Sequence, residues 1–218
     1  MKVIGFFYYL FSNLIHGNWY SIRRGIIWPE ESYKRGMLKR LQCLYKLPYF
    51  IETGTYKGDT TRILRSDFEK LWTIELDNVL FEKASIKLNS YPNITVLQGD
   101  SSDVLKQIIP ALDRPALFWL DGHYSGKGTA KGYSDSPLFE ELNIISKSEI
   151  AGHVIAIDDI SDFCLKDGNM PLSKLLKKLE EMNPQFKFYF DYDILYAVPG
   201  ENLHREFWRK VAYPIVIR

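Results

Sequence analysis

From Pro48 onward the chain alternates short apolar runs with segments of helical length, and this alternation restricts the possible fold more than any other feature. Five runs are expected to be strands buried on both faces, because their hydrophobicity is continuous along the run. They cover residues 49–52, 71–75, 94–98, 116–120 and 153–157. Helices are predicted between them over residues 59–68, 78–89 and 103–109, and another is predicted to start near Pro137. Buried strands alternating with helices indicate a parallel sheet that is covered on both faces.

The end of this pattern differs from the rest. A helix over residues 170–183 is followed by two strands, over 186–190 and 194–198. Strands joined by so few residues must be antiparallel neighbours. The expected fold class is therefore α/β, a Rossmann-like seven-stranded, mostly parallel sheet with helices on both faces and a C-terminal antiparallel hairpin.

The chain has 218 residues, which suits one domain, and we place that domain at residues 48–199. Residues 1–47 are expected to form a basic helical segment, in which Pro29 and two glutamates mark the start of a helix running to about Lys46. Residues 200–218 are expected to form a tail, a short helix plus an extended end, packed on the same domain. The net charge of +1 creates no general attraction to nucleic acid, so no nucleic-acid partner is expected.

The N-terminal segment and the cysteines bear on location and partners. Residues 3–15 are apolar but too short to span a bilayer. This segment is expected to pack over the core or to pair with a second subunit in a homodimer; the alternative is peripheral membrane contact through residues 1–28. Cys43 and Cys164 are isolated, which is typical of a reduced, intracellular protein, so a cytoplasmic location is expected.

The loop after the first strand reads Glu52-Thr-Gly54-Thr-Tyr-Lys-Gly58-Asp-Thr-Thr61. Gly54 permits a sharp turn close to a ligand, and Gly58 lets the next helix start close to the strand. The amides of that helix, with the Thr60 and Thr61 hydroxyls, are suited to receive a carboxylate. The GxxxG spacing differs from the GxGxxG of dinucleotide sites and suits a cofactor that carries an amino acid, with Glu52 near its ammonium group. The alternative is an ordinary turn containing two glycines.

Two later strand ends also carry acids. Glu75 follows Gly54 by 21 residues and is placed to accept hydrogen bonds from two ribose hydroxyls. Asp100, with Ser101 beside it, is suited to accept from an adenine amine. The alternatives are a solvated acid for Glu75 and a helix N-cap for Asp100.

Taken together, these three loops resemble those of the class I S-adenosylmethionine (SAM)-dependent methyltransferases, over residues 49–198. The resemblance implies SAM as the cofactor, with its methionine part near Gly54 and Thr55, its ribose at Glu75 and its adenine at Asp100 and Ser101. The full set of expected cofactor-binding residues is Glu52, Gly54, Thr55, Tyr56, Gly58, Thr60, Thr61, Glu75, Asp100 and Ser101.

The fourth and fifth strands end in three acids, Asp121, Asp158 and Asp159. Acids brought together repel one another unless a cation neutralises them or one is protonated, and oxygen ligands suit Mg²⁺ or Ca²⁺. The pattern resembles the metal-dependent sugar and natural-product O-methyltransferases of the macrocin O-methyltransferase type, which implies a divalent cation at these acids. The alternative is strand-end capping without metal. The long glycine-rich loop after Asp121 departs from that family.

His123 is the expected general base, because its ordinary pKa lies near neutrality, with Asp121 as the other catalytic candidate. His16, His153 and His204 lie on or beside apolar segments and are expected to be structural. The loop over residues 122–136 is expected to act as a lid. The predicted reaction is methyl transfer to an oxygen of a small polar acceptor, namely a sugar, polyol or phenol. A nucleotide-binding module without turnover and an NAD-dependent oxidoreductase are the alternatives.

Overall fold

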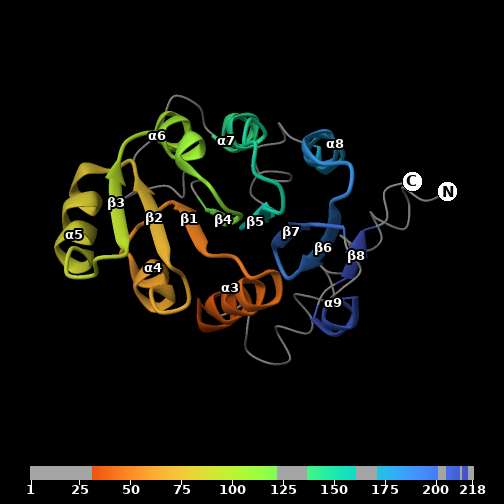
Figure 1. Cartoon of the computed structure of the whole chain (residues 1–218), viewed down its shortest axis with the longest axis horizontal. Coiled ribbons are helices and arrows are strands. Elements are labelled where there is room, and N and C mark those ends of the chain that lie inside the picture. Colours follow the sequence, from red (N-terminus) through yellow and green to blue (C-terminus); the bar gives the residue numbers. More distant parts are fainter. Residues whose placement is uncertain (1–30, 122–136, 161–170, 201–204, 212, 216–218) are drawn as a thin grey trace.

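A single sheet forms the centre of the protein. The computed structural model describes residues 31–121, 137–160, 171–200, 205–211 and 213–215. Within them the strand order is β3-β2-β1-β4-β5-β7-β6-β8 (Figure 1). The strands are β1 (Tyr49–Thr53), β2 (Lys70–Glu75), β3 (Ile94–Gln98), β4 (Ala116–Leu120), β5 (Val154–Ile157), β6 (Lys187–Asp191), β7 (Ile194–Val198) and β8 (Tyr213–Ile215).

The seven predicted strands are confirmed. Strands β1 to β5 pair in parallel, and β7 runs antiparallel to both β5 and β6. The tail adds an eighth strand that was not predicted, because β8 pairs antiparallel with β6 at the edge of the sheet. Three residues that include Pro214 give little sequence signal for a strand, and an edge is where a residue without an N–H is tolerated.

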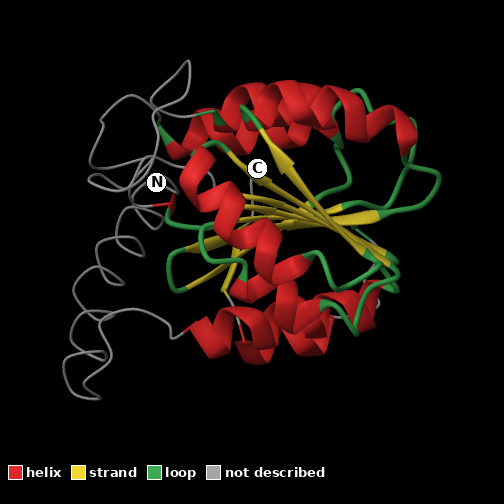
Figure 2. Cartoon of the chain, turned by 90° about the vertical axis from the view of Figure 1, so that its left-hand side faces the viewer, coloured by secondary structure: helices red, strands yellow, loops and turns green. Residues whose placement is uncertain are grey.

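Helices cover both faces of the sheet (Figure 2). They are α3 (Glu31–Tyr45), α4 (Asp59–Leu64), α5 (Asn78–Leu88), α6 (Ser101–Ile108), α7 (Leu138–Ile145), α8 (Leu172–Met182) and α9 (Arg205–Val211), with a 3₁₀ turn at Ile109–Ala111. One apolar cluster joins the sheet to α6, α7 and α8, and the other joins it to α3, α4 and α9. Consecutive side chains of β1 point to opposite faces of the sheet, so that Ile51 lies in the first cluster and Phe50 in the second.

Helix α3 is part of this packing. Its buried residues Met37, Leu38 and Leu41 belong to the same cluster as Phe50. The part of residues 1–47 that the structure describes therefore contributes to the core of the domain, whereas residues 1–30 lie outside the described ranges. No helix in the described ranges is long and apolar enough to cross a membrane.

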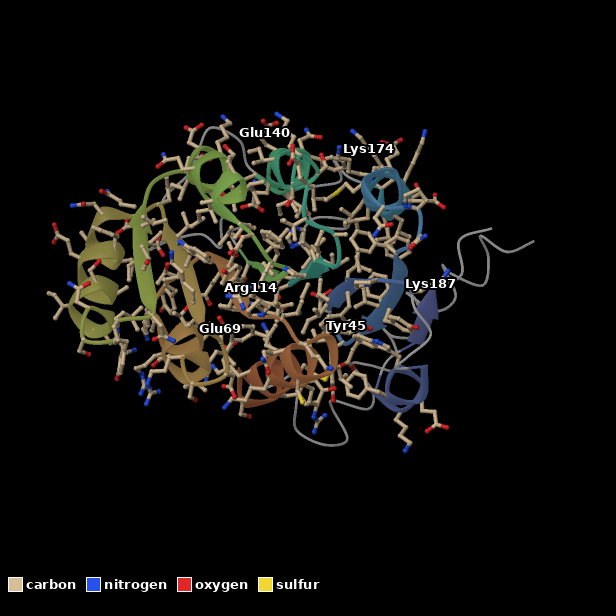
Figure 3. The ribbon with its side chains drawn as sticks, in the orientation of Figure 1. Tyr45, Glu69, Arg114, Glu140, Lys174 and Lys187 are labelled. Atoms are coloured by element: carbon tan, nitrogen blue, oxygen red, sulfur yellow. The ribbon has the colours of Figure 1, made fainter. Side chains whose placement is uncertain are left out.

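Surface contacts connect the amino-terminal ends of the parallel strands, which we call the amino-terminal edge of the sheet. Arg114, just before β4, pairs with Glu69, just before β2, at 2.6 Å, and Figure 3 labels both residues. Arg114 also donates to the Tyr49 hydroxyl (3.1 Å), which in turn donates to Asp113. His153 closes the same edge, because its Nδ1 accepts from the Ala116 amide at 3.0 Å and its Nε2 contacts the Ser148 hydroxyl at 2.8 Å. The expectation that His153 is structural is confirmed.

Candidate functional site

The carboxyl ends of the four central strands finish at the same level. Each ladder extends one step past the strand, because the amides of Gly54, Asp121 and Asp158 donate to carbonyls of the neighbouring strands at 3.0 to 3.1 Å. The residues at this level form a row across the sheet, in the order Glu75, Gly54, Asp121, Asp158. Gly54 alone in this row lacks a side chain. Between Glu75 and Asp121, therefore, no side chain of the row covers the backbone, which suits close approach of a ligand.

The loop between Gly54 and Gly58 needs both glycines. Their φ angles are 89° and 67°, in the region that other residues rarely adopt. A Cβ on Gly58 would lie 2.9 Å from Cδ1 of Leu88. The close neighbour of Gly58 is thus helix α5, whereas close packing of α4 against the preceding strand was expected to require this glycine. Tyr56 also has a positive φ of 48°, and its amide donates to Glu75.

Glu75 ties two loops together from a largely buried position. Its Oε2 accepts from the Tyr56 amide at 2.7 Å and its Oε1 accepts from the Asp77 amide at 2.9 Å. Burial raises the pKa of Glu75, and these backbone hydrogen bonds oppose that rise. A carboxylate has about four acceptor positions, so these amides leave capacity for ligand hydroxyls.

Glu52 and Thr61 face inward. Oε2 of Glu52 accepts from the Thr61 hydroxyl at 2.6 Å and from the Thr73 hydroxyl at 2.7 Å, and Thr73 contacts the Thr55 hydroxyl at 2.6 Å. Burial raises the pKa of Glu52 to about 7. Thr61 is fully buried and donates its single hydroxyl proton to Glu52, and its contact with a ligand carboxylate stays a prediction. Thr60 instead accepts from Arg35 of α3 at 3.5 Å.

The third loop uses Asp100 as a helix cap. Its Oδ1 accepts from the amide of Ser102 at 2.9 Å and from the hydroxyl of Ser102 at 2.6 Å. Helix α6 therefore begins at Ser101 with its N-cap satisfied. Both bonds end on the same oxygen, so capping does not use Oδ2.

Glu141 of α7 is a buried acid that the sequence analysis missed. It is 1% exposed, and the Ser101 and Thr53 hydroxyls lie near enough to favour its charged form. Among the described residues, however, neither Oε1 of Glu141 nor Oγ1 of Thr53 has a partner at hydrogen-bonding distance. Burial dominates and raises the pKa of Glu141 to about 7. Its position on the same helical face as Leu138 and Leu142 was a signal in the sequence.

The three acids after β4 and β5 have a lysine beside them. Nζ of Lys34, in the first turns of α3, lies 2.5 Å from Oδ2 of Asp158, which is 1% exposed. The amide of Asp159 donates to Oδ1 of Asp158 at 3.0 Å. Burial raises the pKa of Asp121, and the charges of Asp158 and Asp159 raise it further. Lys34 was not predicted, because it comes from a helix far away in the sequence.

The arrangement does not fit the expected divalent cation. With Lys34 in place, the described part of the chain contains no group of three His, Cys, Asp or Glu side chains disposed to hold a metal. One oxygen of Asp158, the most deeply buried of the three acids, is already bonded to the ammonium of Lys34. His123 and the predicted lid, residues 122–136, lie outside the described ranges, so the general base and the lid stay predictions.

Comparison with known proteins gives matches among solved structures only; no family model and no curated protein matches the chain. The O-methyltransferase TomG of Streptomyces achromogenes, solved with SAM, is 17% identical with a TM-score of 0.55, over 83% of this chain and 86% of that one. An O-methyltransferase from Bacillus cereus, solved with S-adenosylhomocysteine (SAH), is 16% identical with a TM-score of 0.57, over 78% of this chain and 82% of that one. A spermidine synthase from Thermotoga maritima is 14% identical with a TM-score of 0.55, over 78% and 60%. A shared fold therefore does not decide the reaction.

Proposed function

We propose that this protein, whose fold is that of the class I SAM-dependent methyltransferases, transfers a methyl group from SAM to an oxygen of a small polar acceptor. The observation that carries the proposal is the row Glu75, Gly54, Asp121 at the carboxyl edge of the sheet. It combines an acceptor of ribose hydroxyls, an uncovered backbone position and a carboxylate within three neighbouring strands. This is the crevice where open α/β sheets bind ligands.

The residues present fit the cofactor in three places. Gly54 and Thr55 offer backbone to the methionine part, Glu75 offers acceptor positions to the ribose, and Oδ2 of Asp100 with Ser101 is suited to the adenine. Tyr56 and Gly58 shape the loop, and Glu52 supports it from below through Thr61 and Thr73. Bound SAM supplies a methyl group already activated on a sulfonium, so the protein has mainly to align the acceptor.

The acceptor end is assigned to the Asp121 side of Gly54. Asp121 is one strand away from Gly54 in the row and is suited to take the proton of an acceptor hydroxyl. His123 is the other candidate base. The opposite side of Gly54 is bounded by Glu75, which two backbone amides already hold in place. The GxxxG spacing continues to argue against a dinucleotide and thus against an oxidoreductase.

Calorimetric titration with SAM, S-adenosylhomocysteine and NADH tests this proposal. We expect the first two to bind and NADH not to bind. Glu75→Ala removes two charge-assisted hydrogen bonds to ribose, so it is expected to weaken SAM binding by about 2–4 kcal/mol, at least about tenfold in Kd. Glu69→Ala, at the opposite end of β2, is the matched control and should leave the Kd unchanged. Binding of NADH alone, or unchanged affinity in Glu75→Ala with thermal unfolding intact, would refute this assignment.

The same proposal includes the acceptor, the location of the protein and its other partners. The acceptor is a small molecule such as a sugar, polyol or phenol, and we place the protein in the cytoplasm. A homodimer, and membrane contact through residues 1–28, stay predictions. Incubation with cell extract and SAM, followed by detection of S-adenosylhomocysteine, distinguishes an enzyme from a binding module.

A further inference from the structure

The most deeply buried of the three strand-end acids already has a cation. Asp158 is 1% exposed, and its Oδ2 lies 2.5 Å from the ammonium of Lys34, whose side chain is 15% exposed. Leaving such a carboxylate without a counter-ion would strongly destabilise the fold. The other oxygen, Oδ1, accepts the Asp159 amide. Each oxygen of Asp158 thus has one acceptor position taken by a group of the protein itself, and the group on Oδ2 is positively charged.

Lys34 also interacts electrostatically with the other two acids, Asp121 and Asp159. Asp121 lies beside Asp158 in the row at the end of β4, and Asp159 follows Asp158 directly. The charges of all three carboxylates act on the ammonium of Lys34. On the same helix, Glu31 lies 3.7 Å from Nζ of Lys34 and pairs with Arg35 at 3.1 Å.

The backbone of Lys34 is firmly held. One turn further along α3, Met37 and Leu38 are buried against the sheet, and Leu41 is buried there one turn later. The ammonium is therefore delivered by a packed helix and cannot diffuse away. A divalent ion at the same acids would stand next to this fixed positive charge and would repel it. Mg²⁺ and Ca²⁺ bind through carboxylate oxygens, and here Oδ2 of Asp158 already lies 2.5 Å from the ammonium of Lys34.

We infer that Lys34 is the built-in cation of the acceptor end of the site, standing in place of a divalent metal at Asp121, Asp158 and Asp159. It neutralises part of the acidic cluster and holds Asp158 in one orientation beside Asp121. The assignment of this end to the acceptor rests on the proposed function. The identity of the cation does not, because metal binding is measured without SAM.

The experiment compares Mn²⁺ binding by wild type, Lys34→Met and Lys34→Arg, using calorimetry and thermal unfolding in the absence of cofactor. Wild type and Lys34→Arg are expected to bind no Mn²⁺ at millimolar concentration. Lys34→Met keeps the length of the side chain without its charge, so it should unfold at a lower temperature and recover when Mn²⁺ binds. Its affinity for Mn²⁺ should be at least about tenfold above that of wild type, because the fixed repulsion is gone. Adding Asp158→Asn to Lys34→Met should abolish the gain.

Each other result contradicts the inference. Stoichiometric Mn²⁺ binding by wild type that Asp158→Asn removes would make these acids an ordinary metal site. A folded Lys34→Met that gains no Mn²⁺ affinity would show that the acids are not a cation site. Should Lys34→Met fail to fold in buffer, it is refolded from urea with and without Mn²⁺, and no recovery with Mn²⁺ contradicts the inference. Failure of wild type to bind SAM would refute the proposed function and leave this metal result unaffected.

Discussion

At the scale of single residues, three buried glutamates have different hydrogen-bond partners and therefore different roles. Glu75 accepts two backbone amides and sits in the row that borders the uncovered glycine. Glu52 accepts two threonine hydroxyls beneath the loop. Glu141 lies in the opposite helical layer with an oxygen that has no partner within the described ranges. Their partners, more than their residue type or burial, separate a ligand-facing acid from a supporting one.

The burial of Glu141 leads to a pH-dependent prediction. Its pKa is about 7 in the folded protein against 4.5 for an exposed glutamate, so the folded state keeps a proton that the unfolded chain loses. The free energy of unfolding should therefore fall between pH 4.5 and 7, by up to about 3 kcal/mol from this group. Glu141→Gln mimics the neutral acid, so its stability relative to wild type should be greater at pH 8 than at pH 5.

Urea unfolding of both proteins at pH 5 and pH 8 measures this difference. The matched control is Glu140→Gln, because Glu140 lies on the outer side of the same helix (Figure 3) and is exposed. The control should behave as wild type at both values of pH. An equal effect of Glu141→Gln at pH 5 and pH 8 would contradict the assignment of a raised pKa.

Residues at strand ends were predictable because their location follows from local sequence. Once a run is identified as a buried strand, its last residue must lie at the carboxyl edge of the sheet, and Gly54, Glu75, Asp121 and Asp158 were found this way. Lys34 was not found in this way. It reaches the site through the packing of a helix more than a hundred residues away from Asp158, and no local pattern reports such a contact.

At the scale of elements, most boundaries were predicted within two residues, and β3, β4 and β7 match their predicted ranges. Helix α4 is shorter than predicted, ending at Leu64 instead of residue 68. Strands such as β4 were the easier elements, because burial on both faces makes the run continuously apolar. Strand β3 was also expected to be buried on both faces, and that expectation is wrong, because its residues are only partly buried or exposed. The edge strand β8 has only three residues to mark it.

Two glycines give a paired prediction at this scale. Gly58 has a φ of 67° and no room for a Cβ against Leu88, whereas Gly36, in the middle of α3, has nothing within 4 Å of the same position. Gly58→Ala is expected to destabilise the protein by about 1–3 kcal/mol, because it adds both backbone strain and a clash. Gly36→Ala should stabilise it by up to about 1 kcal/mol, because alanine favours helix.

Urea denaturation of the two variants beside wild type checks the pair. The opposite signs are the point of the comparison, since both changes add one methyl group to a helix start or interior. A stabilised Gly58→Ala would mean that the loop between β1 and α4 relaxes freely. Neither the positive φ nor the contact with Leu88 would then require a glycine at this position.

At the scale of the whole molecule, the amino-terminal and carboxyl-terminal ends of the parallel strands differ in the side chains that they collect. The amino-terminal edge is closed by exposed ion pairs such as Arg114 with Glu69, which contribute modestly to stability and are screened by salt. The carboxyl-terminal edge collects buried acids and has the first turns of α3 beside it, through Lys34 and through Tyr33, which donates to Asp191. Exposed ion pairs therefore lie at the amino-terminal strand ends, and buried acids lie at the carboxyl-terminal strand ends, where the proposed reaction takes place.

This concentration of buried acids predicts the pH dependence of the whole protein. Burial raises the pKa of Glu52 and Glu141 to about 7 and that of Asp158 and Asp191 to about 6. Each of these groups stabilises the fold least at high pH, because stability is lost as pH rises from the unfolded pKa to the folded one. His153 acts in the opposite direction. Burial lowers its pKa from 6.5 to about 4, so its contribution is lost as pH falls through that window.

Four acids outweigh one histidine, so the urea midpoint of the protein without ligands is expected to be higher at pH 5.5 than at pH 8. Exposed acids with lowered pKa, such as Glu69, act mainly below pH 4.5 and are screened by solvent. The double variant Glu52→Gln, Glu141→Gln should flatten the profile, because it removes the two groups with the highest folded pKa among these four. A midpoint that rises steadily from pH 5.5 to pH 8 in wild type would show that Glu52, Glu141 and Asp191 are ionised in the folded state, and that burial does not raise the pKa of these groups.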